Sequence, residues 1–386
     1  FKQKTAYEIM PSLVGSEMCI RDRAEHHARE MITPELAVVF IDYLLERYGS
    51  DPQVTWLLDY REILVMPLVN PDGHKKAEEG LYWRKNTDND DGCSLDNPVY
   101  YWSPHLGVDL NRNYSYHWGE SGASDNPCYV TYRGPGPFSE PETQAIRDYL
   151  TSLYTSAPDG GILITLHSYS NLVLWPWGYT EALAPDAEGL QAIGERLAAF
   201  NGYTPGQASR QLYLASGTTD DWSYGVLGIP SFTFEVGSSS DGFFAPCDRY
   251  DALIQPNLPA FVYAARIADS PYERAQGPQV MALQVRGTGP FTVTATLSSS
   301  QPISTAHLYL GIPPEAGGQP LPMQPADGAW DENDEVAYLG LMGTQVPENR
   351  LAWVCGQDSA GRWGACEAIF INPYLNYWVY LPVIRR

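Results

Sequence analysis

The chain lacks two features that would place it in a membrane or on nucleic acid. No run of about 18 apolar residues occurs, so we expect no membrane span. Basic residues are few: 24 Lys and Arg stand against 46 Asp and Glu, and the formal net charge is −22. Such an acidic surface repels nucleic acid and anionic lipid, and neither is an expected partner. No internal repeat is visible.

What the chain does contain is typical of a globular protein. Its 386 residues are 44% apolar and 18% charged, and 11 Trp and 26 Tyr are too many for a disordered chain. The length suits one large domain and one small one.

Six cysteines allow disulfides. Cys355 and Cys366 bracket a turn-rich segment between two strand-like runs, and Cys93 and Cys128 are a second candidate pair. Free buried thiols fit the same spacing, because spacing alone never proves a bridge. Paired cysteines would indicate an oxidising compartment.

Between residues 24 and 270, apolar strand patterns alternate with helical patterns. Helices are expected at 34–48, 139–150, 186–200 and 255–267, and strands at 61–70, 161–167 and 229–236. This alternation predicts an α/β fold with a mixed, mostly parallel twisted sheet flanked by helices. His167 and Glu235 stand at strand ends, where open α/β sheets place their sites.

The pattern of apolar and polar residues changes after a polar linker at 271–279. Short alternating runs follow at 281–286, 291–297, 305–310, 336–341 and 351–355, and turn residues separate them. This pattern predicts a small all-β, immunoglobulin-like sandwich within 280–386. The closing residues 377–386 are read as a last strand or a sorting tail.

Two imidazoles and one carboxylate suggest a metal site. His27 and Glu30 stand three residues apart, and His167 ends an apolar run. This donor set holds Zn²⁺ and leaves a position open for water. A His-x-x-Glu pair alone is weak evidence, because a lone His or Glu is more often structural. His27 and not His26 is the expected ligand, because only His27 has a Glu three residues later.

Three further motifs strengthen this interpretation. They are Tyr82-Trp-Arg84-Lys, Gly107-Val-Asp109-Leu-Asn111-Arg112-Asn and Ser231-Phe-Thr-Phe-Glu235. Together and in this order, they closely resemble the zinc metallocarboxypeptidases of the pancreatic A/B and bacterial T type. The resemblance implies a catalytic domain at 24–270 with one Zn²⁺ held by His27, Glu30 and His167. It also implies that Asp109 accepts a hydrogen bond from His27 and orients its ring.

The resemblance assigns the remaining chemistry to four side chains. Glu235 would be the general base, which takes a proton from water and delivers it to the leaving amine. Arg84 would polarise the scissile carbonyl. Asn111 and Arg112 would bind the C-terminal carboxylate of the substrate, and arginine offers a planar fork for that pairing.

Three more residues match substrate-binding positions of the family. Tyr213 matches the mobile tyrosine that closes over the substrate, Tyr169 matches a pocket tyrosine, and Arg29 would assist binding. The alternatives stay open: either tyrosine fits a core aromatic, and Arg29 fits a surface or ion-pair arginine.

Asp220 matches the position that lines the floor of the pocket for the last side chain. A buried substrate cation needs a countercharge, so an aspartate there favours Lys or Arg. Asp220 or Asp221 would equally serve as the cap of a helix that begins near Trp222. Gly178 and Ala208 are small and leave room. We expect a basic, or a mixed basic and apolar, preference.

Residues 1–23 stand where the family has an apolar strand. The stretch 11–23 has no clean strand alternation, and it looks like translated sequencing-adapter read-through fused to a truncated gene. We therefore treat 1–23 as non-native and expect the opening strands and any signal peptide to be missing. Cys19 falls inside this stretch, which leaves Cys247 without an obvious partner.

These patterns lead to one main functional hypothesis: a secreted, extracellular zinc metallocarboxypeptidase that acts on peptide or protein C-termini. A relative that trims peptidoglycan peptides and an inactive surface-binding module are the alternatives. We further expect a monomer, and a surface or carbohydrate contact through the sandwich.

Overall fold

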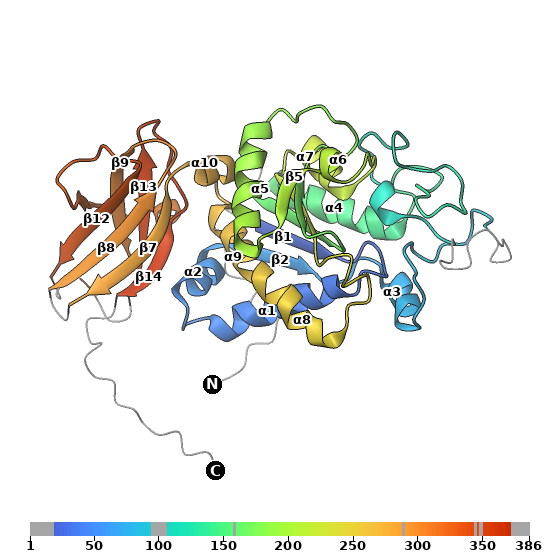
Figure 1. Ribbon diagram of the computed structural model, residues 1–386, viewed down its shortest axis with the longest axis horizontal. Helices are drawn as coiled ribbons and strands as arrows, with labels where there is room; N and C mark the ends of the chain where they lie inside the picture. Colours follow the sequence, from blue (N-terminus) through green and yellow to red (C-terminus); the bar gives the residue numbers. More distant parts are fainter. Residues whose placement is uncertain are drawn as a thin grey trace, which may run out of the picture. The chain divides into compact units, whose positions relative to one another are not determined.

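The computed structural model describes residues 19–93, 106–156, 160–287, 290–342, 346 and 350–371, in two compact units. The larger unit contains the described residues up to Glu46 and Arg61–Pro271, and the smaller unit contains Arg47–Tyr60 and the described residues from Tyr272 on (Figure 1). The boundaries expected from the sequence, at 24–270, 271–279 and 280–386, stay predictions.

The larger unit is built on a six-stranded mixed sheet. Its strand order is β2-β1-β3-β6-β4-β5, and neighbouring strands are parallel except for the antiparallel pair β4/β6. The predicted mixed, mostly parallel sheet is therefore confirmed. The strands are β1 (Cys19–Ala24), β2 (Glu62–Met66), β3 (Ile162–His167), β4 (Leu172–Trp175), β5 (Thr204–Gln207) and β6 (Ser231–Glu235).

Strand β1 lies mostly within the stretch 1–23, whose non-native origin stays a prediction. Cys19–Ala24 pairs in parallel with both β2 and β3. Its sequence, CIRDRA, shows neither the alternation of a half-buried strand nor the apolar run of a buried one, so no pattern marks it as a strand. Residues 1–18 lie outside the described part.

Helices flank this sheet (Figure 1). Phe40 of α1 and Phe234 of β6 both contact Phe261 of α9, while α4 and α7 share a second apolar cluster with Leu163 of β3. The four predicted helices are confirmed, although the last begins with a 3₁₀ turn. The bounds are α1 (Ile32–Arg47), α3 (Pro71–Glu78), η3 (Leu110–Arg112), α4 (Pro141–Ser156), α5 (Ala187–Asn201), α6 (Ala208–Gln211), α7 (Thr219–Leu227), η4 (Cys247–Arg249), α8 (Tyr250–Ile254), η5 (Gln255–Asn257) and α9 (Leu258–Ile267). None of the described helices is both long and apolar enough to cross a membrane.

The smaller unit consists of two four-stranded antiparallel sheets, β10-β9-β13-β14 and β11-β12-β8-β7, so the predicted all-β sandwich is confirmed. Alternate residues of β8, such as Phe291, Val293 and Ala295, point into its apolar core. Helix α2 joins this unit through an edge-to-face contact of Trp56 with Trp353. The bounds are α2 (Pro52–Tyr60), α10 (Pro271–Gln276), β7 (Gln279–Arg286), β8 (Phe291–Ser298), β9 (Ile303–Leu310), η6 (Pro314–Ala316), β10 (Pro320–Pro322), β11 (Gln324–Pro325), β12 (Asp334–Leu341), β13 (Arg350–Asp358) and β14 (Glu367–Ile371). Helix α10 occupies most of the predicted linker, and residues 377–386 lie outside the described part.

Both candidate disulfides are present: Cys93–Cys128 in the larger unit and Cys355–Cys366 in the smaller one. Cys247 is an exposed free thiol.

Candidate active site

Three buried donors from two separate segments meet beyond the carboxyl ends of β1 and β3. His27 Nδ1 lies 2.8 Å from a Glu30 oxygen, His167 Nδ1 lies 2.9 Å from the other, and the two Nδ1 atoms are 3.2 Å apart. In the part of the chain that the structure describes, this is the one group of His, Cys, Asp and Glu that could hold a metal ion.

The local backbone explains this convergence. Strand β3 delivers His167 at its last residue, and a turn after β1 delivers the other two, with the Glu30 N–H donating to the His27 carbonyl at 3.0 Å. His26 is not one of the donors: its Nε2 lies 2.9 Å from the Tyr114 hydroxyl, and its ring stacks on that of His167 with the centroids 5.7 Å apart.

Protonation differs among the three donors. Burial would lower the pKa of His167, but the Glu30 carboxylate outweighs it and raises that pKa. Burial would raise the pKa of Glu30, but the two neighbouring imidazoles outweigh it and hold that pKa well below the ordinary value. Burial lowers the pKa of His27, and the Arg84 charge adds to that shift. A charged carboxylate beside a neutral imidazole is the state in which these groups bind metal.

The donor set also fits Zn²⁺ by geometry. Tetrahedral ligands at about 2.0–2.1 Å from zinc stand roughly 3.3 Å from one another. The nearest approaches of the three residues, 2.8, 2.9 and 3.2 Å, are close to this spacing. Two His and one carboxylate are the ligand type of catalytic sites that keep one position open.

Asp109 links the donor group to an arginine. Its Oδ1 lies 3.1 Å from His27 Nε2, and its Oδ2 accepts hydrogen bonds from Arg84 Nε at 3.0 Å and Nη2 at 2.9 Å. Burial alone would raise the pKa of Asp109, yet Arg84 and His27 hold it well below its ordinary value. Asp109 is therefore a carboxylate that orients two proposed functional groups at once.

The segments that carry Arg84 and Asp109 are joined at Asn86. The Asn86 N–H donates to the Val108 carbonyl at 3.0 Å, and its side-chain oxygen accepts from the Val108 N–H at 2.7 Å. Gly107 has a φ of +91°, and a Cβ there would lie 2.1 Å from the Asn86 carbonyl oxygen. Only glycine permits this close approach.

Glu235 lies beside the donor group at the end of β6. It is the register partner of His167 in the parallel pair β3/β6. Burial raises the pKa of Glu235 to about 7, with Glu30 and Asp220 adding to the rise while His167 and Arg84 oppose it. A carboxylate with such a pKa accepts and releases protons near neutral pH.

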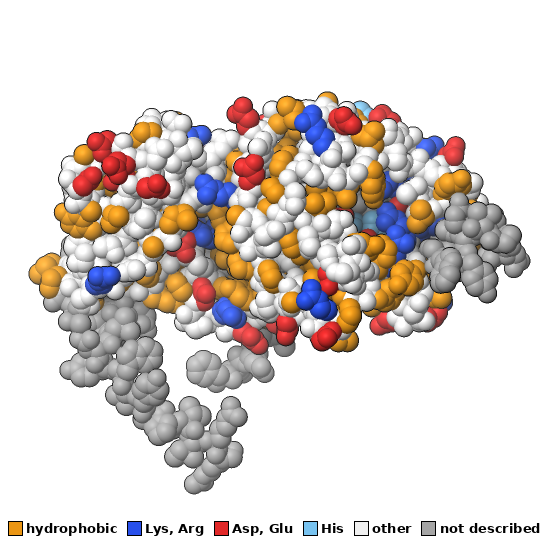
Figure 2. All heavy atoms as spheres, viewed as in Figure 1, with side chains coloured by type: hydrophobic (Ala, Val, Ile, Leu, Met, Phe, Trp, Pro, Cys, Tyr) orange, Lys and Arg blue, Asp and Glu red, His pale blue; other side chains and the backbone are white. Residues whose placement is uncertain are grey.

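Asn111 and Arg112 occupy the short helix η3, which Asp109 caps through the Asn111 N–H at 3.1 Å. Arg112 is buried, and its Nε and Nη1 donate to the carbonyls of Gly122 and Asn111 at 3.0 and 2.6 Å. These backbone bonds fix the guanidinium. Figure 2 shows basic side chains gathered beside a histidine where the face of the larger unit is hollowed.

Tyr213 and Phe243 each lie near an arginine of the candidate site. Tyr213 is 56% exposed, and the Arg112 guanidinium lies 5.9 Å from the centroid of its ring. The Arg29 guanidinium lies 4.1 Å from the ring centroid of Phe243, which also contacts Tyr169 at 4.9 Å. Because its side chain is exposed, Tyr213 is not a core aromatic. Phe243 was missed from the sequence, because its loop carries no periodic pattern.

The alternative role of Asp220 and Asp221 as a helix cap is wrong. Thr218 caps α7, with its hydroxyl accepting from the Asp221 N–H at 3.4 Å. Asp221 instead accepts from the N–H groups of Gly178 and Tyr179, both at 2.9 Å. Asp220 is 4% exposed, and its charge contributes to the raised pKa of Glu235.

Known proteins resemble this chain over the larger unit. A family model described as zinc carboxypeptidase matches residues 20–258. Human carboxypeptidase B is 34% identical over 247 residues, which cover 62% of this chain and 56% of that protein. Mouse carboxypeptidase A1 is 36% identical over 233 residues, which cover 58% and 52%. The chain thus spans about half the length of these relatives.

A solved structure supports the same likeness. Bovine thrombin-activatable fibrinolysis inhibitor, in complex with tick carboxypeptidase inhibitor, superposes with a TM-score of 0.56 at 30% identity. The match covers 65% of this chain and 82% of that one.

Proposed function

Because the chain belongs to the zinc carboxypeptidase family, we propose that it hydrolyses the C-terminal peptide bond of peptides and proteins. The observation that carries the proposal is the convergence of His27, Glu30 and His167, with Glu235 in register beside them. The two disulfides support an oxidising, extracellular location. The monomeric state and the contact through the sandwich stay predictions.

His27, Glu30 and His167 would hold the zinc ion, which supplies a Lewis acid when bound. Glu235 takes a proton from the attacking water and later gives it to the leaving amine. Arg84, fixed by Asp109, faces the negative charge that develops on the carbonyl oxygen.

Binding of the chain end is the task of other residues. The fixed guanidinium of Arg112 pairs with the terminal carboxylate, and Asn111 adds a polar contact. Tyr213, whose side chain is exposed, closes over the bound residue. With these roles, the last residue of the substrate occupies the site beside Arg112, and its amine, which is the leaving group, lies near Glu235.

A free terminal carboxylate should be required for cleavage. We expect the chain to cleave a peptide with a free C-terminus and to leave its C-terminal amide intact, because the amide cannot pair with Arg112. Arg112→Met should lower kcat/KM for the free peptide by about 10²-fold, since bonds to charged groups contribute 1.5–3 kcal/mol each. Release of the terminal residue is measured by mass spectrometry. Equal cleavage of acid and amide would exclude a carboxypeptidase.

We further propose that Asp220 gives a preference for C-terminal Lys and Arg. Asp220→Leu should lower kcat/KM for peptides that end in Lys by roughly 10²-fold, because the buried substrate cation loses its partner. Peptides that end in Leu should be cleaved at least as well as before. A peptide panel that differs only in the last residue provides the measurement.

Two controls accompany this test. Asp220→Asn keeps the shape and removes the charge, so it should behave like Asp220→Leu on Lys-ended peptides. Asp251→Leu replaces an exposed acid of α8 and should change nothing. Unchanged cleavage of Lys-ended peptides by both Asp220 variants would refute the pocket-floor role.

A further inference from the structure

We propose that Lys85 is a positioning residue that holds Asp109, and through it Arg84 and His27, by binding the turn at residues 127–132. This inference rests on the proposed function for its kinetic consequence. Its structural consequence can be measured without any activity. Below, residues 127–132 are called the Cys128 turn.

Lys85 and Arg84 point to different parts of the site. Arg84 donates to Asp109, whereas Lys85 extends to the Cys128 turn and is 1% exposed. Its Nζ donates to the carbonyls of Pro127 at 2.7 Å and Tyr129 at 2.9 Å. These two carbonyls flank Cys128, so one ammonium fixes both sides of that residue.

The burial of this amine is costly. Burial lowers the pKa of Lys85 to about 8; the Arg84 charge adds to that shift, while Asp109 and Asp91 oppose it. Its ammonium also lies 5.5 Å from the ring centroid of Tyr132. An apolar side chain would fill this space without the desolvation of a charge. A lysine here therefore indicates a task that an apolar residue cannot perform.

The Cys128 turn is also hydrogen-bonded to Asp109. The carbonyl of Tyr132 accepts a hydrogen bond from the Asp109 N–H at 2.7 Å. The Asp109 carboxylate in turn contacts both Arg84 and His27. Lys85 thus binds the Cys128 turn, and the same turn binds the backbone of Asp109, whose carboxylate orients a proposed metal ligand.

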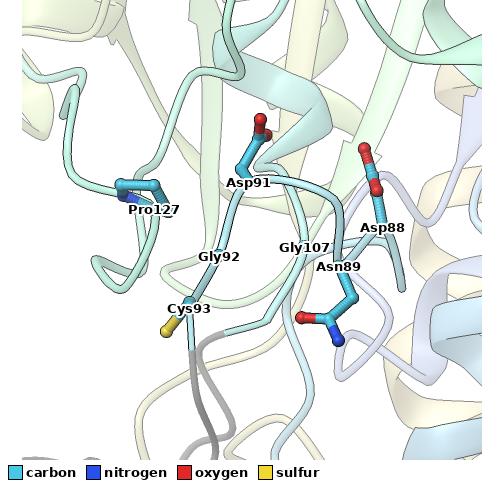
Figure 3. A pocket seen from close by; sticks show the side chains of 7 residues that line it. All are labelled: Asp88, Asn89, Asp91, Gly92, Cys93, Gly107 and Pro127. Atoms are coloured by element: carbon cyan, nitrogen blue, oxygen red, sulfur yellow. The ribbon is translucent and has the colours of Figure 1, made fainter.

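A disulfide restrains the same turn. Cys93 and Cys128 are bonded, and Figure 3 shows Cys93, Pro127 and Gly107 around one shallow hollow. Gly107 stands two residues before Asp109 on the chain. The bridge restrains Cys128 itself, whereas Lys85 binds the carbonyls of the residues on both sides of it.

The test compares Lys85→Met with Lys85→Arg and with the matched control Lys75→Met. Methionine keeps the length and removes both charge and donors, arginine keeps the charge, and Lys75 is an exposed lysine whose side chain is 69% accessible. We expect Lys85→Met to lower kcat by about 10–100-fold, the usual cost of losing a group that orients a metal ligand. KM should change by less than roughly threefold, because the Arg112 contacts persist. Lys85→Arg should recover most of kcat, and Lys75→Met should match wild type.

Amide hydrogen exchange of the zinc-loaded protein separates this inference from the proposed function. In Lys85→Met, exchange should accelerate in residues 127–133 and also in 107–109, while η3, β3 and β6 stay unchanged. If the wild type binds zinc but cleaves no peptide, the proposed function fails and the exchange result still decides the role of Lys85.

Two outcomes would overturn the inference. One is faster exchange confined to residues 127–133 with kcat unchanged, which would make Lys85 a stabiliser of the turn alone. The other is a loss of kcat that Lys85→Arg does not recover. If Lys85→Met fails to fold, Lys85→Gln, which removes the charge and is one atom too short to bind both carbonyls, is measured in its place against the same criteria.

Discussion

Glu235→Gln is expected to remove nearly all hydrolysis and to leave zinc bound. Glutamine has almost the same shape but cannot accept a proton, and general-base catalysis contributes about 10²–10⁴-fold to rates. The loss should appear in kcat, because Glu235 lies beside the donor group and is not part of it. The measurements are kcat on a peptide with a free C-terminus and zinc per chain by elemental analysis.

The matched control is Glu188→Gln, which makes the same change on the exposed side of α5. It should keep wild-type kcat. A Glu235→Gln variant that retains zinc and turns over within about threefold of wild type would remove Glu235 from the mechanism.

The second large effect is expected for the metal donors. His27→Asn should abolish zinc binding at micromolar metal and remove activity with it, since two donors remain where a catalytic site uses three. A bound metal stabilises the folded state, so the wild type should lose several degrees of Tm in a chelator. His27→Asn should have the same Tm with and without the chelator.

The neighbouring residue supplies a demanding control. His26 is buried next to His27, and its Nε2 lies 2.9 Å from the Tyr114 hydroxyl; its ring stacks on that of His167, but it is not one of the three donors. His26→Asn should lose about 1 kcal/mol of stability with that hydrogen bond, and it should keep zinc and activity. Zinc loss in His26→Asn, or zinc retention in His27→Asn, would reverse the assignment.

The α/β pattern was predictable because its helices carry clear amphipathic spacing and its central strands are long apolar runs. The strand at Cys19–Ala24 was not, because no propensity marks a six-residue segment whose place depends on pairing with β2 and β3. The association of α2 with the C-terminal strands was equally hidden, since it depends on a contact between Trp56 and Trp353 that are far apart in the chain.

In the candidate site, too, local patterns could be predicted and contacts between distant residues could not. Residues in motifs, such as His27, Asp109 and Glu235, could be named because the spacing within each motif is local. The cap role that stayed open for Asp220 or Asp221 could not be settled from sequence, because aspartate is a good cap, and only the contact of Asp221 with Gly178 and the position of Thr218 decide it. Lys85 could not be identified from sequence, because its partners are backbone carbonyls about 40 residues away.

The side-by-side placement of His167 and Glu235 on β3 and β6 has a geometric consequence. Adjacent strands run about 4.8 Å apart, so the lateral separation of these two residues is an architectural constant of the sheet. A slip of one residue between the strands would turn one of the two side chains to the opposite face. Backbone pairing, which no single side-chain replacement readily alters, therefore sets the working distance between them.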